Sequence, residues 1–459
     1  MKKHFSILGI FFQFILFLYI YSPPFKIVPL GVIKFISLGS IIGLLLLFHK
    51  TTGKILRYRF LAIHLIIFAF IITYSFAQDF VIYPHSLSLG QTNFYEQLLI
   101  NLELLPITLF ISLFLRKKLK FNHFDLIQSL VNIGIIQSFF CLIMLLLPPL
   151  RFFILGSLLE HEEVEERFLS AGFYGNYRGF GVGISYEFAF SVFQGFVLAF
   201  ICLLCLHNFR KYRYLLFFTP LILLSIILNA RIGLWIFVGF LLVAGAAYLR
   251  YMSAVSIIKN SLIIGFTGLL LTFWVSSLGD DSAIAKNIEW VGKSYTQTVE
   301  FFSGEGEKGT LYLLANKHIH VPESIAGFTF GEGRYVFGEP ARDTNSSLTS
   351  DVGYIRNIYF GGLLYLGLLF GSLLPLFWSG LKLQKEYLLK ILMCFLLLAC
   401  VVAHIKGNIF SSNSGYRAVY LIFIFSIVNH YITRQEMRKK QQLYWLSPQR
   451  FAAKLNPNK

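Results

Sequence analysis

Charged residues are scarce in this chain of 459 residues. Asp, Glu, Lys and Arg together make up 14% of the sequence, whereas soluble domains carry roughly 25%. Hydrophobic residues make up 56%, and the mean hydropathy is +0.67. This composition excludes a water-soluble globular protein.

Cysteine is also scarce, and no pattern of cysteine or histidine indicates a metal centre. The five cysteines fall inside apolar runs, where we interpret them as small apolar residues rather than disulfide partners. Cys202 and Cys205 form a CxxC pair, but no βαβ pattern surrounds it. His161 is followed by acidic residues without the second histidine of an HExxH motif. We therefore expect no disulfide framework, no metal and no cofactor.

Long apolar runs are abundant. A helix needs about 20 apolar residues to cross the hydrocarbon layer of a membrane. Runs of about this length recur along nearly the whole chain, at 5–21, 27–48, 60–77, 94–115, 124–147, 186–207, 214–229, 232–249, 257–278, 353–379, 388–404 and 418–433. The sequence therefore predicts an all-α polytopic membrane protein with about twelve transmembrane helices.

Lysine and arginine are concentrated in every second connection between these runs. Basic clusters occur near residues 2–3, 50–59, 116–120, 210–213, 250–259, 382–385 and 434–459. Short loops rich in Lys and Arg stay in the cytoplasm, so both termini are predicted to be cytoplasmic. The net charge of +17 lies mostly in these connections. We interpret it as contact with anionic membrane lipid rather than binding of nucleic acid.

The connections on the opposite, external side are unequal in length. The sequence divides into nine helices over 1–278, a large external loop over 279–352, three helices over 353–433 and a basic cytoplasmic tail over 434–459. The large loop carries many aromatic residues among polar ones, which is typical of a folded cap that stacks on sugars or covers a cavity. The alternative is a packed lid without a ligand.

Several cationic side chains lie where the runs meet the external face. Guanidinium groups bind phosphate oxygens in a bidentate manner, so these residues are candidates for binding an anionic headgroup. They are Arg178, Arg231, Arg356, Lys406 and Arg417. The alternative for each is contact with lipid headgroups or a role at a helix end, because long cationic side chains reach the interface at low cost.

Four short motifs resemble those of a known family. Residues 350–356, Ser-Asp-Val-Gly-Tyr-Ile-Arg, run into Tyr-Phe-Gly-Gly-Leu at 359–363. This segment resembles the one that follows the large external loop in Wzy-type O-antigen and capsular polysaccharide polymerases. Residues 178–189, 229–234 and 404–407 are similar to other Arg-rich or Lys-containing segments of that family.

The resemblance implies transfer of a growing glycan from one undecaprenyl diphosphate carrier onto a repeat unit carried by another. It places this reaction at the periplasmic face of a bacterial inner membrane, with a chain-length regulator protein as a further partner. The five cations would bind the diphosphates. Asp351 is the first candidate for the general base and His404 the second.

Two alternatives to a polymerase stay open. The related O-antigen ligases usually carry a His-Asn pair in the large loop, whereas this chain reads Asp343-Thr344-Asn345. A transporter or flippase is a second alternative, because twelve helices with both termini inside suit many carriers. Glu103 with Pro106 is the one polar, helix-breaking combination that favours transport.

Overall fold

The computed structural model describes residues 7–23, 31–84, 93–147, 149–150, 153–154, 181–182, 188–230, 232–248, 319–334, 352–411 and 413–445. Within these residues the secondary structure is helical and contains no strand. The prediction of an all-α fold is therefore confirmed for the described part of the chain. The predicted ninth span, 257–278, lies outside it.

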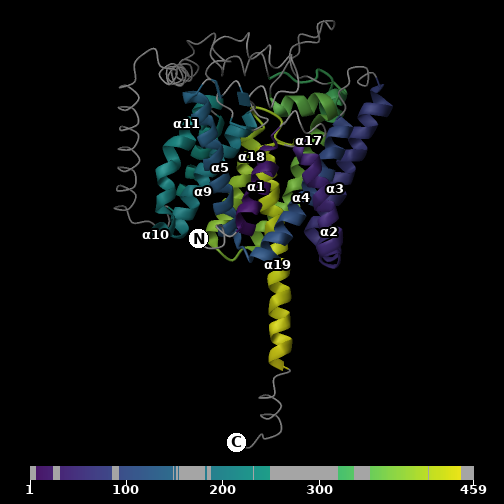
Figure 1. The fold of residues 1–459 in the computed structure, drawn as a ribbon. Coiled ribbons are helices and arrows are strands. Elements are labelled where there is room, and N and C mark those ends of the chain that lie inside the picture. Colours follow the sequence, from purple (N-terminus) through teal and green to yellow (C-terminus); the bar gives the residue numbers. More distant parts are fainter. Residues whose placement is uncertain are drawn as a thin grey trace, which may run out of the picture.

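Each of the other predicted spans overlaps a described helix, and Figure 1 shows these helices as one bundle. Two of them end in π-helical turns, η1 after α3 and η3 after α4. The elements are α1 (Ile7–Tyr21), α2 (Val32–Leu56), α3 (Arg59–Phe76), η1 (Ala77–Ile82), α4 (Asn93–Phe114), η3 (Leu115–Leu119), α5 (His123–Leu146), α9 (Phe188–His207), α10 (Phe209–Tyr212), the 3₁₀ turn η4 (Arg213–Phe218), α11 (Thr219–Asn229), α12 (Ile232–Tyr248), α16 (Ile325–Phe330), α17 (Gly353–Leu383), α18 (Tyr387–Ala403) and α19 (Ser414–Trp445).

Seven stretches of helix among the described residues are long and apolar enough to cross a membrane. They comprise α2, α3 with η1, α4 with η3, α5, α9, α10 through α11, and α17. Helices α1, α12 and α18 are apolar but shorter. The protein is therefore a multi-pass membrane protein.

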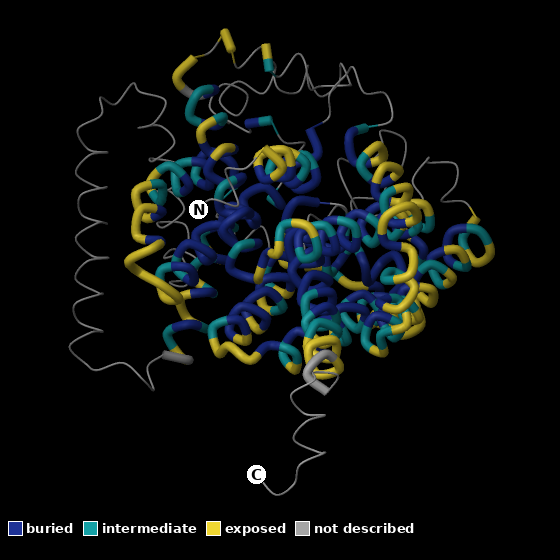
Figure 2. Tube along the Cα trace, turned by 60° about the horizontal axis from the view of Figure 1, so that its bottom comes forward, coloured by how far each residue is buried: buried dark blue, intermediate teal, exposed yellow. Residues whose placement is uncertain are grey.

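The distribution of burial agrees with a lipid environment. Figure 2 shows buried residues gathered in the middle of the bundle and exposed ones toward its periphery. Many of the exposed side chains are large and apolar, for example Leu46 at 74%, Phe70 at 62% and Leu242 at 68% exposure. Apolar surface of this extent would be a liability in water, but it matches the hydrocarbon tails of lipid.

Helix α19 is the innermost helix, and its composition reflects that position. Residues 414–428 are all buried, and they pack against α4, α17 and α9. A helix surrounded by protein needs no apolar surface toward lipid, so polar residues such as Ser414, Arg417 and Ser426 are accommodated inside the bundle. Beyond the bundle the same helix continues to Trp445 (Figure 1), inside the segment predicted to be a basic tail.

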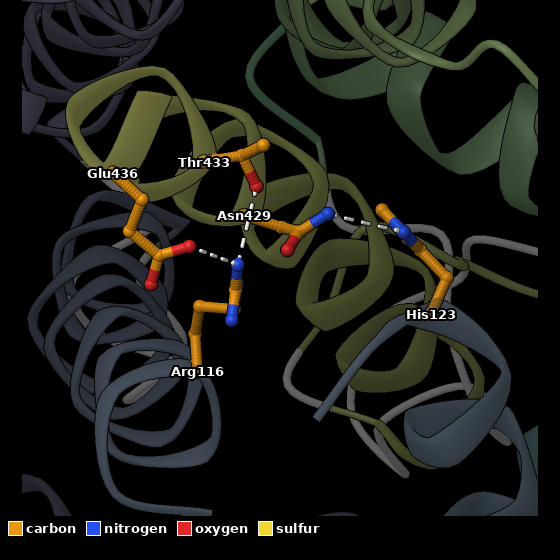
Figure 3. A network of polar contacts seen from close by, with 5 residues as sticks. All are labelled: Arg116, His123, Asn429, Thr433 and Glu436. Atoms are coloured by element: carbon orange, nitrogen blue, oxygen red, sulfur yellow. Dashed lines mark hydrogen bonds and ion pairs between the residues drawn. The ribbon is translucent and has the colours of Figure 1, made fainter. Parts of the chain in front are cut away.

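Three of the basic segments meet at one end of the bundle. Lys117 in η3 donates to Thr51 Oγ1 at the end of α2 (2.6 Å). Arg116 donates to Thr433 Oγ1 (3.3 Å) and forms an ion pair with Glu436 (2.9 Å), both on α19 (Figure 3). This clustering is what a shared membrane face requires.

Helix α5 begins at this same end with a capping box. The Asn122 side chain accepts from the Asp125 N–H, and the Asp125 carboxylate accepts from the Asn122 N–H. Its first residue, His123, contacts the amide of Asn429 on α19 (3.4 Å; Figure 3). His123 also lies 2.8 Å from Gln384 Nε2 and 3.2 Å from Ser426 Oγ. Two sequence-local bonds and these distant contacts thus fix how α5 enters the bundle.

Helix α17 is broken near the opposite end of the bundle. Gly361 and Gly362 have non-helical backbone angles, and Gly362 has φ +67°. A side chain is unfavourable at such an angle, and a Cβ on Gly362 would also collide with the Thr329 carbonyl. The short helix α16 packs at this break. The predicted large external loop therefore contains at least one helix, and it is docked on the bundle.

Candidate functional site

Four of the predicted site residues lie in the described part of the chain, and three lie outside it. Arg356, His404, Lys406 and Arg417 are described. Arg178, Arg231 and Asp351 lie outside the described residues, so their roles remain predictions. The distance between Arg231 and Arg356, which a shared diphosphate site would keep short, is likewise outside the described structure.

The start of α17 is pressed against the turn that follows α18. A Cβ on Gly353 would lie 2.6 Å from the Gly407 carbonyl oxygen and 2.8 Å from His404 Cε1. Only a residue without a side chain permits this approach. The turn itself continues the last turn of α18, because the backbone N–H groups of His404 and Lys406 donate to Cys400 O and Ala403 O. Residues 353 and 404–407 therefore meet at one junction.

His404 fills the centre of this junction. It is fully buried, and its Nδ1 accepts a hydrogen bond from the Ile409 N–H (3.3 Å). A neutral imidazole that accepts at Nδ1 carries its proton on Nε2. Nε2 lies 3.0 Å from the side-chain amide nitrogen of Asn357, and the ring also interacts with the backbone of Gly353. We orient the amide with its oxygen toward the ring proton.

The surroundings of His404 keep it neutral. The rings of Tyr354, Phe370 and Phe410 contact it edge to face, with centroids 4.6 to 5.5 Å away. Burial, and after it the positive charge of Arg356, lower the pKa of His404 to about 3. Both ring nitrogens are engaged within the protein and no solvent reaches them. This geometry favours a positioning role for His404 over the predicted role of general base.

The rest of the turn is held by two asparagines. Asn413 caps α19, because its Oδ1 accepts from the Tyr416 N–H (2.9 Å). Its Nδ2 donates to the Ile409 carbonyl (3.0 Å) and to Ser411 Oγ (2.9 Å). Asn408 Oδ1 accepts from the Phe410 N–H (3.1 Å). The turn is therefore rigid at the point where it supports the start of α17.

Arg356 and Lys406 bring positive charge to this junction. Arg356 is half-buried in the first turn of α17, close enough to His404 to act on it electrostatically. Lys406 is exposed on the turn. The N-terminal end of α17 adds the partial positive charge of its helix dipole. An arrangement of two cations beside a helix N-terminus suits a phosphate group.

Arg417 does not belong with Arg356 and Lys406. It is 3% exposed, and its Nη1 donates to the carbonyls of Tyr19 (3.0 Å) and Ile20 (3.3 Å) at the end of α1. It also interacts electrostatically with Glu103 on α4. The predicted diphosphate contact is therefore not favoured. Arg417 instead ties α1 and α4 to the start of α19.

Asn357 and Asn413 are the residues that the sequence analysis missed. Asn357 lies one helical turn after Gly353 on a helix that is mostly apolar, and a buried amide in such a helix normally has a specific partner. Asn413 lies a few residues before the apolar run 418–433 and directly before the first residue of α19, which is the position of a helix cap. Both signals were present in the sequence.

Other chemistry is sparse in the described residues. No three His, Cys, Asp or Glu side chains gather there as metal ligands, so the absence of a metal stays a prediction. The five cysteines are free thiols. Comparisons of the chain with protein-family models, with curated proteins and with solved structures found no match.

Proposed function

We propose that this protein is a glycosyltransferase that polymerises lipid-linked oligosaccharide repeat units. The observation that carries the proposal is the junction of Arg356 and Lys406 with the N-terminal end of α17, on the rigid support of His404 and Asn413. A diphosphate that leaves a sugar develops negative charge, and preorganised cations stabilise it. The carrier would be undecaprenyl diphosphate, in a bacterial inner membrane.

The proposed topology has twelve transmembrane helices with both termini in the cytoplasm. The clustering of Arg116 and Lys117 with the ends of α2 and α19 supports it, because these basic segments lie at one end of the bundle. The junction of α17 with the turn 404–407 and the docked α16 belong to connections that the alternation of charge assigns to the periplasm.

The test is polymer formation by purified protein. The chain is incubated in detergent with a synthetic repeat unit linked to a polyprenyl diphosphate, and the products are separated by size. A ladder of products that differ by one repeat unit is expected. Transfer of glycan to a lipid A acceptor instead, without a ladder, would indicate a ligase. Unchanged substrate under conditions that keep the protein folded would contradict both.

A transporter is the second candidate, favoured by the buried charges of Arg417 and Glu103. Ionisable side chains inside a bundle commonly mark a transport pathway. Here the Arg417 guanidinium is occupied by two backbone carbonyls, which also fits a purely structural role. If the reconstituted protein moved a lipid-linked saccharide across the membrane of proteoliposomes without changing its length, that result would support transport.

A further inference from the structure

The external segment that carries α16 also brings charged side chains to the first turns of α17. The N–H groups of Glu332 and Arg334 both donate to the carbonyl of Tyr359 (2.8 and 3.4 Å), and the N–H of Gly333 donates to the carbonyl of Phe360 (3.1 Å). These carbonyls are available to the segment because α17 is broken directly after Phe360. The side chains of Glu332 and Arg334 are therefore held beside the beginning of α17.

The carboxylate of Glu332 is fixed in one place and is still reachable from solvent. Its Oε2 forms an ion pair with Arg334 Nε (3.4 Å), and the Glu332 side chain is 23% exposed. Its Oε1 lies against Gly327 of α16, where a Cβ would come within 2.8 Å of it. The carboxylate also interacts electrostatically with the side chain of Tyr359. Contacts with both α16 and α17 thus hold it in position.

Arg356 lies between this carboxylate and the junction at His404. Asn357 faces His404, and Tyr359 faces Glu332. Around the axis of an α-helix Arg356 is turned by about 100° from Asn357 and, in the opposite direction, by about 60° from Tyr359. The carboxylate of Glu332 and the proposed diphosphate site therefore adjoin each other on the first turns of α17.

Other described carboxylates near this end of the bundle are less well placed. Asp79 is 1% exposed, and Asp79 and Glu96 both act on α17 beyond its break rather than on its first turns. Glu323 interacts with Tyr359, but more weakly than Glu332 does, and it is exposed on the surface of the segment. Glu332 combines partial exposure with a fixed position beside α17.

The histidines near this place are also less suited to receive a proton. Both ring nitrogens of His404 are engaged within the protein. His320 packs its ring against Tyr359, with centroids 5.7 Å apart, and its Nε2 is buried. A general base must reach the acceptor hydroxyl directly or through one water molecule. The partly exposed carboxylate of Glu332 meets this requirement better than either imidazole.

We propose that Glu332 is the general base of the glycosyl transfer and that the segment containing it binds the acceptor saccharide. This inference rests on the proposed function. The acceptor hydroxyl oxygen bonds to the anomeric carbon of the donor while the bond from that carbon to the diphosphate breaks. The hydroxyl proton passes to the Glu332 carboxylate. The electron pair of the broken bond leaves with the diphosphate, which Arg356 and Lys406 stabilise.

The positions of the charges match this step. A direct displacement requires the base and the leaving group on opposite sides of the anomeric carbon. Lys406 lies on the turn after α18, whereas Glu332 lies on the docked external segment, with Arg356 between them. A sugar bound between the turn and the segment therefore meets cations on one side and a carboxylate on the other.

The experiment measures the initial rate of chain extension by the purified full chain with the synthetic lipid-linked repeat unit. Glu332→Gln keeps the size of the side chain but cannot take up the proton, so the rate is expected to fall by about 10²–10⁴-fold. Arg334→Ala is the matched control, because it breaks the same ion pair and leaves the carboxylate. An exposed ion pair contributes little, so its rate should fall by less than about tenfold. Equal losses in both variants would overturn the proposal.

Binding of farnesyl diphosphate separates chemistry from folding. A ligand that binds the folded state raises Tm, and Glu332→Gln is expected to keep this rise, whereas Arg356→Ala should lose most of it. Loss of the rise in Glu332→Gln would mean that the variant fails in folding or in donor binding. The assignment of Glu332 as the base would then be wrong.

Glu323→Gln and His320→Gln test the neighbouring candidates, and both are expected to keep most of the rate. Loss of extension in either of them, with normal extension by Glu332→Gln, would assign the base to that residue and overturn the proposal. Failure of the unmodified protein to form a ladder is a different result, because it would contradict the proposed function itself.

Discussion

At the scale of single residues, the position of a polar side chain decides what it can do. Arg356, Lys406 and Arg417 all looked alike in the sequence, as cations near the external face. Arg417 is buried and donates to backbone carbonyls of α1, whereas Arg356 is half-buried and Lys406 is exposed. His404 looked like a base, but both its nitrogens are engaged inside the protein.

Arg356→Ala is expected to abolish chain extension while the protein remains in the membrane. Loss of one preorganised donor to a developing anion costs ~2.7–4 kcal/mol, or about 10²–10³ in rate. Arg356→Lys should recover activity only partly, because an ammonium lacks the bidentate fork. The measurement is glycan length on a gel, with membrane level checked by immunoblot.

Lys439→Ala is the control for this prediction. Lys439 is exposed on the part of α19 that leaves the bundle, and a tail lysine contributes only ~1 kcal/mol of lipid attraction. It should leave glycan length unchanged. If Arg356→Ala produced long glycan at a normal protein level, the role of Arg356 would be structural, and the proposed diphosphate contact would be wrong.

His404 is expected to make the folded protein less stable at low pH. Its pKa is about 3 in the folded protein and about 6.5 in an unfolded chain. Between these values only the unfolded state takes up the proton, so the stability present above pH 6.5 falls as the pH is lowered. From pH 7 to pH 5 this loss is about 2 kcal/mol.

The measurement is Tm at pH 7 and pH 5 for the unmodified protein and for His404→Gln. Glutamine does not titrate, so the decrease in Tm should be smaller in the variant even if its Tm at pH 7 is lower. An identical decrease in both proteins would mean that other groups account for the pH dependence.

At the scale of elements, the sequence predicted where helices are and failed to predict where they are interrupted or extended. Apolar composition alone locates a span, because each residue adds to its preference for lipid. The break in α17 depends on Thr329 and Phe330, which meet it from the separate helix α16. The continuation of α19 to Trp445 depends on helix propensity rather than on hydropathy.

Gly362→Ala is expected to destabilise the protein. The residue adopts φ +67°, which costs a side chain about 1 kcal/mol or more, and the new Cβ would also collide with Thr329 O. Docking of α16 should therefore weaken. A lower Tm and faster hydrogen exchange in residues 325–330 would support this expectation.

Gly367→Ala is the matched control in the same helix. No atom lies within 4 Å of a Cβ built there, and alanine is favoured over glycine inside a helix by roughly 0.5–1 kcal/mol. Its Tm should be unchanged or higher. If both variants behaved alike, the break at Gly361 and Gly362 would not be a structural requirement.

At the scale of the whole molecule, the alternation of basic and non-basic connections can be tested on described residues. Ile325 of α16 is 86% exposed, and Lys440 of α19 is exposed beyond the other end of the bundle. Cysteines placed at these two positions, with the native cysteines replaced, should react with an impermeant thiol reagent from opposite sides of the membrane. The Ile325 position is expected to be external.

Reaction of both cysteines from the same side of intact cells would contradict the proposed topology. A cysteine at Leu396, which is fully buried in α18, is the negative control and should react only after denaturation.

The candidate site illustrates which parts of a whole molecule can be inferred from a sequence. Arg356 and His404 were identified because they lie in short motifs, and Arg356 does lie at the junction. Their relation was not predictable, since Asn357 and His404 come together only when α17 packs beside α18. Likewise, nothing local indicates that Arg417 would bind carbonyls 397 and 398 residues away.

The central position of α19 has a consequence for the order in which this protein is assembled during translation. The ribosome delivers α19 after every other described helix, yet α19 occupies the middle of the bundle. The earlier helices must therefore remain in the membrane with the place of α19 unfilled until α19 is inserted. Polar groups such as His64, which is hydrogen-bonded to Tyr420 of α19 in the folded protein, lack their final partners until then. Chaperones and membrane proteases would have this interval in which to act on the unfinished bundle.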